Sequence, residues 1–245
     1  MQQLETRKKP MRVASRVPVA NSMLAALPRK QYQRLLSGLE SVALTFGEVL
    51  YEPGERIRYV YFPGDSLVSL LTLVDEQSAL EVGMVGREGM VGVPLFLGTE
   101  VSPVRALVQG AGTAMRMKAA RFSQAIRKSP RLQQEVNRYT GVLIAQITQT
   151  AACNRFHVVE ARLARWLLMT RDRLRSDEFP LTHEFLGHML GVRRVGVTKA
   201  ARALQGRRLI RYSRGKIRIL DQRGLEAAAC SCYELVKDMY DVVGD

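Results

Sequence analysis

The residues that suggest chemistry most strongly form a basic segment near the C-terminus. Ten Lys or Arg lie between Arg193 and Arg218, a stretch of 26 residues that contains no Asp or Glu. Soluble proteins usually intersperse the two signs of charge, so this segment predicts a polyanionic partner such as a nucleic acid or a membrane surface. The whole chain is also basic, because 37 Lys and Arg against 23 Asp and Glu give its 245 residues a net charge of +14.

Two short helices joined through a glycine are predicted around the start of this segment. Thr182 can cap a helix over residues 183–190, Gly191 supplies a tight turn, and a second helix covers residues 194–205. Apolar side chains recur at helical spacing in the second helix and predict its buried face: Val197, Ala200, Ala201 and Leu204. This arrangement is typical of a helix-turn-helix.

A basic hairpin follows the second helix. Residues 209–212 and 216–220 alternate apolar and basic side chains, as half-buried strands do, and Arg214-Gly215 forms the turn between them. Two helices followed by a hairpin form a winged helix, which places one helix in the DNA major groove. A surface-bound membrane helix is disfavoured, because the apolar face is needed for the core.

The basic side chains divide into two groups on this winged helix. Those on the polar side of the second helix face the expected major groove, namely Arg194, Lys199 and Arg202. Those of the hairpin and of the segment before it suit the flanking phosphates: Arg207, Arg208, Arg211, Arg214, Lys216 and Arg218. The alternative is a solvated basic face, which does not account for the helix-turn-helix frame that carries it.

The N-terminal half is predicted to be rich in β-structure. Residues 1–20 form a basic tail, and residues 21–45 show helical spacing with a break at Pro28. From residue 45 to 117, Gly and Pro alternate with short β-rich runs, which predicts a β-sandwich or barrel. The runs cover residues 49–51, 59–62, 67–74, 79–84, 104–108 and 113–117.

A long helix is predicted to follow, because Ser129-Pro130 supplies a cap and a first helical residue. Its apolar stripe steps by four, three and four residues: Leu132, Val136, Tyr139 and Leu143. We interpret this stripe as a homodimer seam, and packing against the chain's own domain is the alternative. The predicted domains are a sensor at 21–128, a dimerisation helix at 129–156 and a DNA-binding domain at 157–245.

Other functional classes find little support in the residues. The three cysteines, Cys153, Cys230 and Cys232, include no CxxC pair, so we expect neither a disulfide framework nor a metal site. No nucleophile–base pair or phosphate-binding loop predicts an enzyme. The longest apolar runs are too short to span a membrane, and the N-terminus lacks a signal core, so the expected location is the cytoplasm.

Nearly the whole chain resembles the Crp/Fnr family of bacterial transcription regulators. The similarity is strongest in LTHEFLGHMLGVRRVGVTKAARALQGRRLIRYSRGKIRIL, continues in HVVEARLARWLLMTRDRL and extends to YEPGERIRYVYFPGDSLVSL. The resemblance implies an α+β fold with an N-terminal β jelly-roll of the cyclic-nucleotide-binding type, a long dimerisation helix and a C-terminal winged helix-turn-helix. The implied partners are double-stranded DNA, a second copy of the chain and, for an activator, RNA polymerase.

The resemblance also implies which side chains read bases. An Arg, a Glu and a second Arg often do so in this family, and Arg194, Val195 and Lys199 stand at the matching positions. Val195 cannot accept a hydrogen bond from cytosine but can touch a thymine methyl group, so we expect a half-site different from the family's best-known one. The phosphate contacts expected from this match are Arg202, Arg207, Arg214, Lys216 and Arg218.

The family's cyclic-AMP site has only partial counterparts in this chain. Glu88 stands for the acidic residue, but the expected Arg-Ser-Ala triplet reads Val104-Arg105-Ala106, so cyclic-AMP binding is not expected. The candidate effector pocket consists of Gly86, Glu88, Gly89, Arg105 and Thr148, and the effector is unknown. The sequence therefore predicts a homodimeric transcription regulator without a resident cofactor, and a ligand-independent architectural DNA-binding protein is the alternative.

Overall fold

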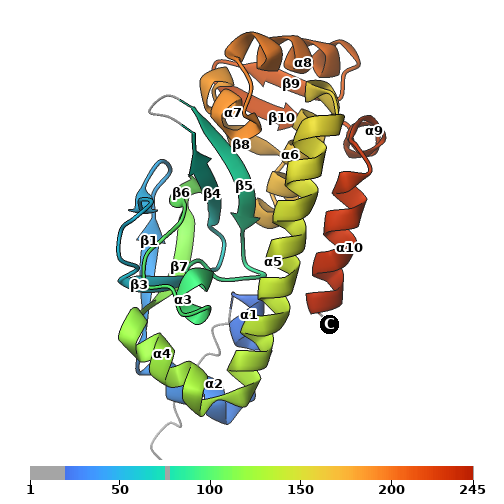
Figure 1. The fold of residues 1–245 in the computed structure, drawn as a ribbon. Helices are drawn as coiled ribbons and strands as arrows, with labels where there is room; N and C mark the ends of the chain where they lie inside the picture. The colour runs from blue at the N-terminus through green and yellow to red at the C-terminus, as the bar shows by residue number, and fades with distance from the viewer. Residues whose placement is uncertain (1–19, 75–77, 245) are drawn as a thin grey trace, which may run out of the picture.

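The computed structural model of the protein describes residues 20–74 and 78–244, so most of the predicted basic tail lies outside the described residues. In Figure 1, a β-rich N-terminal domain (residues 20–128) and a C-terminal domain (residues 157–244) lie along one long helix. This helix, α5 (Pro130–Phe156), extends from the level of α4 (Ala119–Lys128) to the C-terminal domain. The α+β class expected from the sequence is confirmed.

Two antiparallel sheets form the N-terminal domain. One has the strand order β1-β7-β3, with bounds β1 (Leu39–Leu44), β3 (Tyr59–Pro63) and β7 (Gly112–Lys118). The other has the order β2-β6-β4-β5, with bounds β2 (Val49–Tyr51), β4 (Leu67–Leu73), β5 (Ala79–Val85) and β6 (Arg105–Gly110). All six β-rich runs of the sequence are strands, and the described residues of this domain hold seven strands rather than the eight implied by the resemblance.

One strand of this domain was predicted as helix. The break at Pro28 is confirmed, because α1 (Ser22–Ala25) and α2 (Arg29–Leu36) lie on either side of it. Residues 39–44, however, form β1, which pairs with β7 from Leu39↔Met117 to Leu44↔Gly112. The prediction of helix up to residue 45 is wrong because this continuous pairing with a distant strand outweighs local helical spacing. The short helix α3 (Val93–Phe96) was not predicted.

The apolar stripe of α5 packs inside its own chain. Leu132, Val136, Tyr139 and Leu143 are each at most 5% exposed and belong to the core of the N-terminal domain. The interpretation of these four residues as a dimer seam is therefore wrong, and the alternative, a helix lying on its own domain's core, is correct.

Two glycines explain how the sheet accepts this helix so closely. A Cβ atom at Gly89 would lie 2.0 Å from Cε2 of the Tyr139 ring, and one at Gly83 would lie 3.3 Å from Cδ1 of Leu143. Any larger residue at position 89 would occupy the volume of a ring that is completely buried. Gly89 thus makes room for Tyr139, which is not the ligand-binding role that the sequence suggested.

The C-terminal domain has its own core, built around α6 (Val159–Leu174). The buried Trp166 of this helix packs with side chains of the helix-turn-helix, α7 (His183–Leu190) and α8 (Arg194–Gly206). A three-stranded sheet of order β8-β10-β9 closes the domain, with bounds β8 (Glu178–Pro180), β9 (Ile210–Ser213) and β10 (Lys216–Ile219). The chain ends with α9 (Gln222–Ala228) and with α10 (Cys232–Gly244), which lies beside α5 in Figure 1.

The short strand β8 was not predicted from the sequence. Phe179 is buried and pairs with Ile217 of β10. Pro180 can take part because β8 is an edge strand, where a missing backbone N–H costs no ladder hydrogen bond. Among the described residues, no helix is long and apolar enough to cross a membrane.

Candidate DNA-binding surface

The turn between α7 and α8 is set by a cap and two glycines. The Thr182 side chain accepts a hydrogen bond from the Phe185 N–H, which confirms the predicted cap of α7. Gly191 has φ of +59°, in the left-handed region that favours glycine. A Cβ at Gly187 would lie 2.9 Å from the Val192 carbonyl oxygen, so only glycine lets the chain fold back tightly at this point. The turn therefore fixes how α8 leaves the domain.

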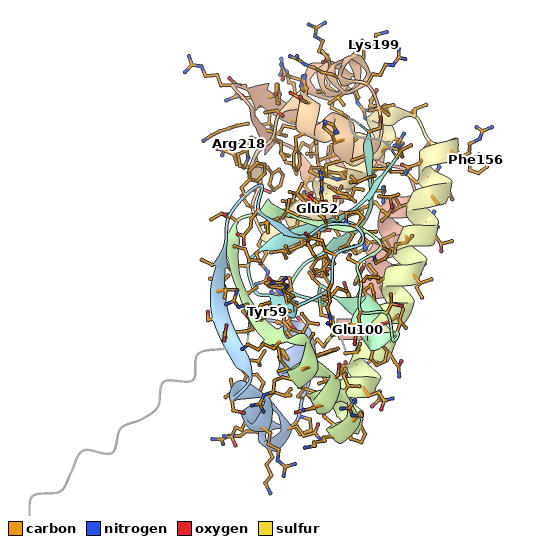
Figure 2. All side chains as sticks on the ribbon, turned by 60° about the vertical axis from the view of Figure 1, so that its left-hand side comes forward. Glu52, Tyr59, Glu100, Phe156, Lys199 and Arg218 are labelled. Atoms are coloured by element: carbon orange, nitrogen blue, oxygen red, sulfur yellow. The ribbon has the colours of Figure 1, made fainter. Side chains whose placement is uncertain are left out.

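Helix α8 has one buried and one exposed face, as its sequence predicts. Val197, Ala200, Ala201 and Leu204 are all buried in the core of the C-terminal domain. The residues expected to read bases, Arg194, Val195 and Lys199, are all exposed, and the Val195 side chain has nothing to pack against at 65% exposure. Figure 2 shows Lys199 directed away from the body of the molecule at the outer edge of the C-terminal domain.

The hairpin beside α8 has the geometry that its turn residues predict. Arg214 and Gly215 both have positive φ, +49° and +74°, as a two-residue hairpin turn of type I′ requires. Ile217 and Ile219 of β10 are buried, whereas Lys216 and Arg218, which alternate with them, are exposed. The strand therefore presents its cations on the solvent side.

The cations expected to contact phosphates differ in their pairing. Among the described residues, Arg202, Arg214 and Arg218 form no salt bridge, although all three are exposed. Arg218 also lies directly opposite Arg211 in the β-ladder, an unfavourable pair of like charges that a bound anion would relieve.

Two cations of the same set are already paired within the chain. Arg207 Nη1 lies 3.2 Å from Glu160 Oε1, and Lys216 Nζ lies 3.4 Å from Glu178 Oε1. The structure therefore brings all the expected side chains into one domain but leaves only some of them unpaired.

His183 connects the two helices with the hairpin, a role that sequence reasoning missed. Its ring stacks on Tyr212 at 4.2 Å between ring centroids, and its Nδ1 lies 3.0 Å from Thr198 Oγ1. Burial, followed by the positive charges of Arg194 and Arg202, lowers the pKa of His183. The ring is therefore neutral at pH 7 and holds α8 against α7 and β9 without adding a charge.

Comparison with known proteins identifies this domain. A family model described as the Crp-like helix-turn-helix domain matches residues 161–228, which include α7, α8 and the hairpin. Residues 161–228 therefore resemble the helix-turn-helix domain of Crp-like proteins. No curated protein sequence matches it.

Solved structures share the fold of most of this chain. FixK2 from Bradyrhizobium japonicum is 14% identical with a TM-score of 0.67, over 79% of this chain and 98% of that one. A CRP-family transcriptional regulator from Thermus thermophilus is 20% identical with a TM-score of 0.66, over 77% and 96%. The c-di-GMP-responsive regulator CLP from Xanthomonas campestris is 17% identical with a TM-score of 0.65, over 78% and 99%.

The structure does not bring together the residues expected to form an effector pocket. Gly86 and Glu88 follow the end of β5, whereas Arg105 begins β6 at the opposite end of the sheet, because Leu67↔Gly110 and Leu71↔Arg105 fix the register of β4 and β6. Arg105 pairs with Glu52 at 2.7 Å. Thr148 is exposed and donates to the Ile144 carbonyl oxygen of its own helix. This candidate pocket is wrong, because β6 runs antiparallel and carries Arg105 away from Glu88.

Glu88 instead connects the two domains. Its Oε1 lies 2.9 Å from Nε of Arg173 on α6, in a largely buried pair, and it also accepts from the Gly86 N–H. The guanidinium of Arg173 stacks on the Tyr240 ring of α10 at 4.8 Å. A Cβ at Gly86 would lie 2.7 Å from Glu88 Oε2, so this glycine leaves room for the carboxylate. Sequence reasoning missed Arg173, because its partner lies 85 residues away.

A second polar connection between the domains is fully buried. Glu81 of β5 accepts hydrogen bonds from Nε1 of Trp166 on α6, at 3.0 Å, and from Oγ of Ser69 on β4, at 2.6 Å. Burial raises the pKa of Glu81 to about 7, although the hydrogen bond from Ser69 and the charge of Arg165 oppose the shift. Glu81 is therefore poised to change its protonation state near neutral pH at the contact between the sheet and α6.

The N-terminal domain does contain a cavity beneath α5, of about 160 Å³. Gly92, Val93, Ser102 and Val104 line it from the domain side, and Thr140, Leu143 and Ile147 line it from the helix. None of the described residues that line it carries a charge. The described lining of the cavity therefore offers no charged partner for a phosphate group.

The cysteines have a different arrangement from the expected one. Cys230 and Cys232 were interpreted as small residues of a C-terminal helix, with no metal site in the chain. The structure places the ligand atoms of both, of Cys153 and of His157 within 4.8 Å of one another. One feature of the sequence could have indicated this cluster. Cys153 and His157 are four residues apart, which puts both on one side of the end of α5.

Proposed function

We propose that this Crp/Fnr-type regulator is a homodimer that binds a near-palindromic DNA site in a sequence-specific manner. The observation that carries the proposal is the outer face of α8, where Arg194, Lys199 and Arg202 are exposed and form no salt bridge among the described residues. A helix with a buried apolar face and an unpaired cationic face fits a major groove about 12 Å wide. The adjacent hairpin adds cations that can contact the phosphates on either side of the groove.

The side chains divide into base readers and phosphate contacts in this proposal. Arg194 and Lys199 donate to base edges, and Val195 touches a thymine methyl group. Arg202, Arg214 and Arg218 bind phosphates with their charge fully available. Arg207 and Lys216 must first leave Glu160 and Glu178, so they contribute less to affinity.

The homodimer would use the face of α5 opposite to the buried stripe. Exposed residues recur there at spacings of four, three, four and three, which is a continuous helical seam: Asn137, Gly141, Ile144, Thr148 and Ala151. Ile144 is 56% exposed, and Phe156 at the end of the helix is 76% exposed. Figure 2 shows the Phe156 side chain directed away from the helix. Pairing of these faces would cover apolar surface and set two copies of α8 about 34 Å apart, on successive major grooves.

We do not propose cyclic AMP as an effector of this protein. The cavity beneath α5 is uncharged, and a phosphate held there would lose its charge-assisted hydrogen bonds. A ligand of this cavity would have to be small and mainly apolar, and it would act on α5 because Thr140, Leu143 and Ile147 form one of its walls.

An in-vitro selection of duplexes followed by fluorescence anisotropy tests the proposal. The selected duplexes are expected to contain two inverted half-sites one helical turn apart. Arg194→Ala should weaken binding by roughly 1–3 kcal/mol and relax the preference at one position of each half-site. Arg29→Ala on α2 is the matched control, because Arg29 is exposed at the far end of the molecule from α8 (Figure 1).

The same titrations separate a regulator from an architectural DNA-binding protein. A regulator binds its selected duplex more tightly than a scrambled duplex at the same salt concentration, typically by a factor of 10³ or more. Equal affinity for both duplexes, and equal losses for Arg194→Ala on both, would favour the architectural role. A monomer at all concentrations in analytical ultracentrifugation would contradict the dimer.

A further inference from the structure

We propose that Cys153, His157, Cys230 and Cys232 form a structural zinc site that fastens the end of α5 to the C-terminal helices. Their four ligand atoms come from two places far apart in the sequence and lie within 4.8 Å of one another. The three sulfur atoms belong to buried side chains, with exposed fractions of 0% for Cys153, 8% for Cys230 and 0% for Cys232. Three thiolates and one imidazole are a common ligand set of structural zinc.

Two of the distances between the ligand atoms are close to those around a single zinc ion. Cys153 Sγ lies 3.5 Å from Cys230 Sγ, and Cys232 Sγ lies 3.4 Å from His157 Nδ1. Zinc–ligand bonds of about 2.3 Å to sulfur and about 2.0 Å to nitrogen place tetrahedral ligands about 3.5–3.8 Å apart. An iron–sulfur cluster would need a wider arrangement, because its ligands are spread over two or four iron atoms.

The end of α5 and the link between α9 and α10 hold the four ligand side chains in place. Cys153 lies in the last turn of α5, and His157 is the residue that ends this helix, with its N–H bonded to the Cys153 carbonyl oxygen. Cys230 and Cys232 lie where the chain passes from α9 into α10. Because α10 packs along α5, the helix ends that bear the four side chains meet without a long connecting loop.

The charges around the cluster also fit a metal bound by thiolates. Arg162 and Arg165 of α6 are about 5% and 4% exposed and lie near enough to Cys153 to interact with its charge. Among the described residues, neither forms a salt bridge with a carboxylate, and both leave their buried Nε without a hydrogen-bond partner. Buried cations are costly unless enough counter-charge lies near them, and three thiolates with one Zn²⁺ would carry a net negative charge beside both guanidinium groups.

The sulfur atoms have a further polar neighbour of the kind that surrounds metal ligands. Gln149 Nε2 donates a hydrogen bond to Cys232 Sγ at 3.0 Å, as outer-shell groups around metal ligands commonly do. Binding of Zn²⁺ would release the three thiol protons to solvent and leave each sulfur as a metal ligand.

The position of the site gives it a role in the regulator. Helix α6, which begins the C-terminal domain, follows His157 directly. A zinc ion here would hold α5, the entry of α6 and the start of α10 together, and so would set the orientation of the C-terminal domain on the long helix. This role goes beyond DNA recognition itself, because none of the four ligands lies on α8 or on the hairpin.

The metal content of the full-length chain tests the proposal. The protein is purified without a metal-affinity column and measured by inductively coupled plasma mass spectrometry, and one zinc per chain is expected. Replacement of zinc by cobalt should give the visible absorption bands of a tetrahedral thiolate site. No bound zinc, iron with inorganic sulfide, or a Cys153–Cys230 disulfide in the purified protein would overturn the proposal.

Matched variants assign the ligands. Cys232→Ser and His157→Ala should lose zinc, whereas Ser231→Ala and His188→Ala should keep it, because neither Ser231 nor His188 belongs to the cluster. Retention of one zinc in both ligand variants would overturn the assignment. If the ligand variants do not fold, the zinc content and cobalt spectrum of the unaltered chain still decide the outcome, since they require no substitution.

Discussion

The two domains of the chain use their charged side chains in opposite ways. In the N-terminal domain and its contact with α6, Glu88 pairs with Arg173 and Glu81 is enclosed by hydrogen bonds. On α8, Arg194 and Lys199 are exposed and unpaired among the described residues. Charges that satisfy one another hold the domains together, whereas charges left open are available to a partner. The predictions below test this difference, beginning with the largest expected effect.

Gly89→Ala should destabilise the chain most. Its new Cβ would lie 2.0 Å from the buried Tyr139 ring, so the long helix would have to move away from the sheet. We expect the free energy of unfolding to fall by about 4 kcal/mol, above the usual cost of overpacking, in urea denaturation.

Gly206→Ala is the control for this change, because no atom lies within 4 Å of a Cβ at that position. An unchanged denaturation midpoint for Gly89→Ala would contradict the packing of α5 on the sheet.

Glu88→Gln should cost about 3 kcal/mol, because it leaves the buried Arg173 without its counter-charge. Glu100→Gln removes the partner of Arg56 in an exposed pair, with side-chain exposures of 63% and 73%, and should cost less than about 1 kcal/mol. Both variants are compared by thermal and urea denaturation. Equal effects of the two changes would remove the distinction between interdomain and surface charges.

Glu81→Gln should change how stability depends on pH. The pKa of Glu81 is raised to about 7 in the folded chain from 4.5 in the unfolded chain, so between these values the folded chain holds a proton that the unfolded chain has lost. Stability is therefore lost as pH rises through this range, by roughly 1.4 kcal/mol per pH unit.

The Gln side chain does not titrate, so the variant should show a shallower decline between pH 5 and pH 7. Urea denaturation at several pH values measures the slope. The same slope in the variant and the unaltered chain would show that another group titrates.

Arg218→Ala should have the smallest effect. It removes one phosphate contact and relieves the unfavourable pair with Arg211, so folding stability should stay within about 0.5 kcal/mol. Affinity should fall by a similar factor on selected and scrambled duplexes, with a salt dependence shallower by about one unit. A loss confined to the selected duplex would instead assign Arg218 to base recognition.

Local signals predicted the C-terminal domain better than the N-terminal one. Thr182, Gly191 and the apolar spacing of α8 are contained within 25 residues, and each acts through its nearest neighbours. The prediction of a dimer seam on α5 was wrong because the same stripe of apolar residues can pack against a partner helix or against the chain's own sheet. Only Gly83 and Gly89, which make room for Leu143 and Tyr139, decide between these two packings, and they lie 60 and 50 residues away from those side chains in the sequence.

The polar residues that could not be predicted from the sequence all form side-chain contacts with residues far away in the chain. Arg173 acquires its role from Glu88, and Glu81 from Trp166, each across 85 residues. The cysteine cluster joins Cys153 to Cys230 across 77 residues. Each of these residues has an ordinary local context, so only the folded chain shows what it contacts.

The most direct test of the account is the affinity of the purified full-length chain for its selected duplex and for a scrambled duplex, measured by anisotropy at one salt concentration. We predict at least about 10³-fold tighter binding of the selected duplex, with two chains bound per duplex, and a reduced preference for Arg194→Ala. Equal affinity for both duplexes, or one chain per duplex, would contradict a dimer that reads DNA through α8.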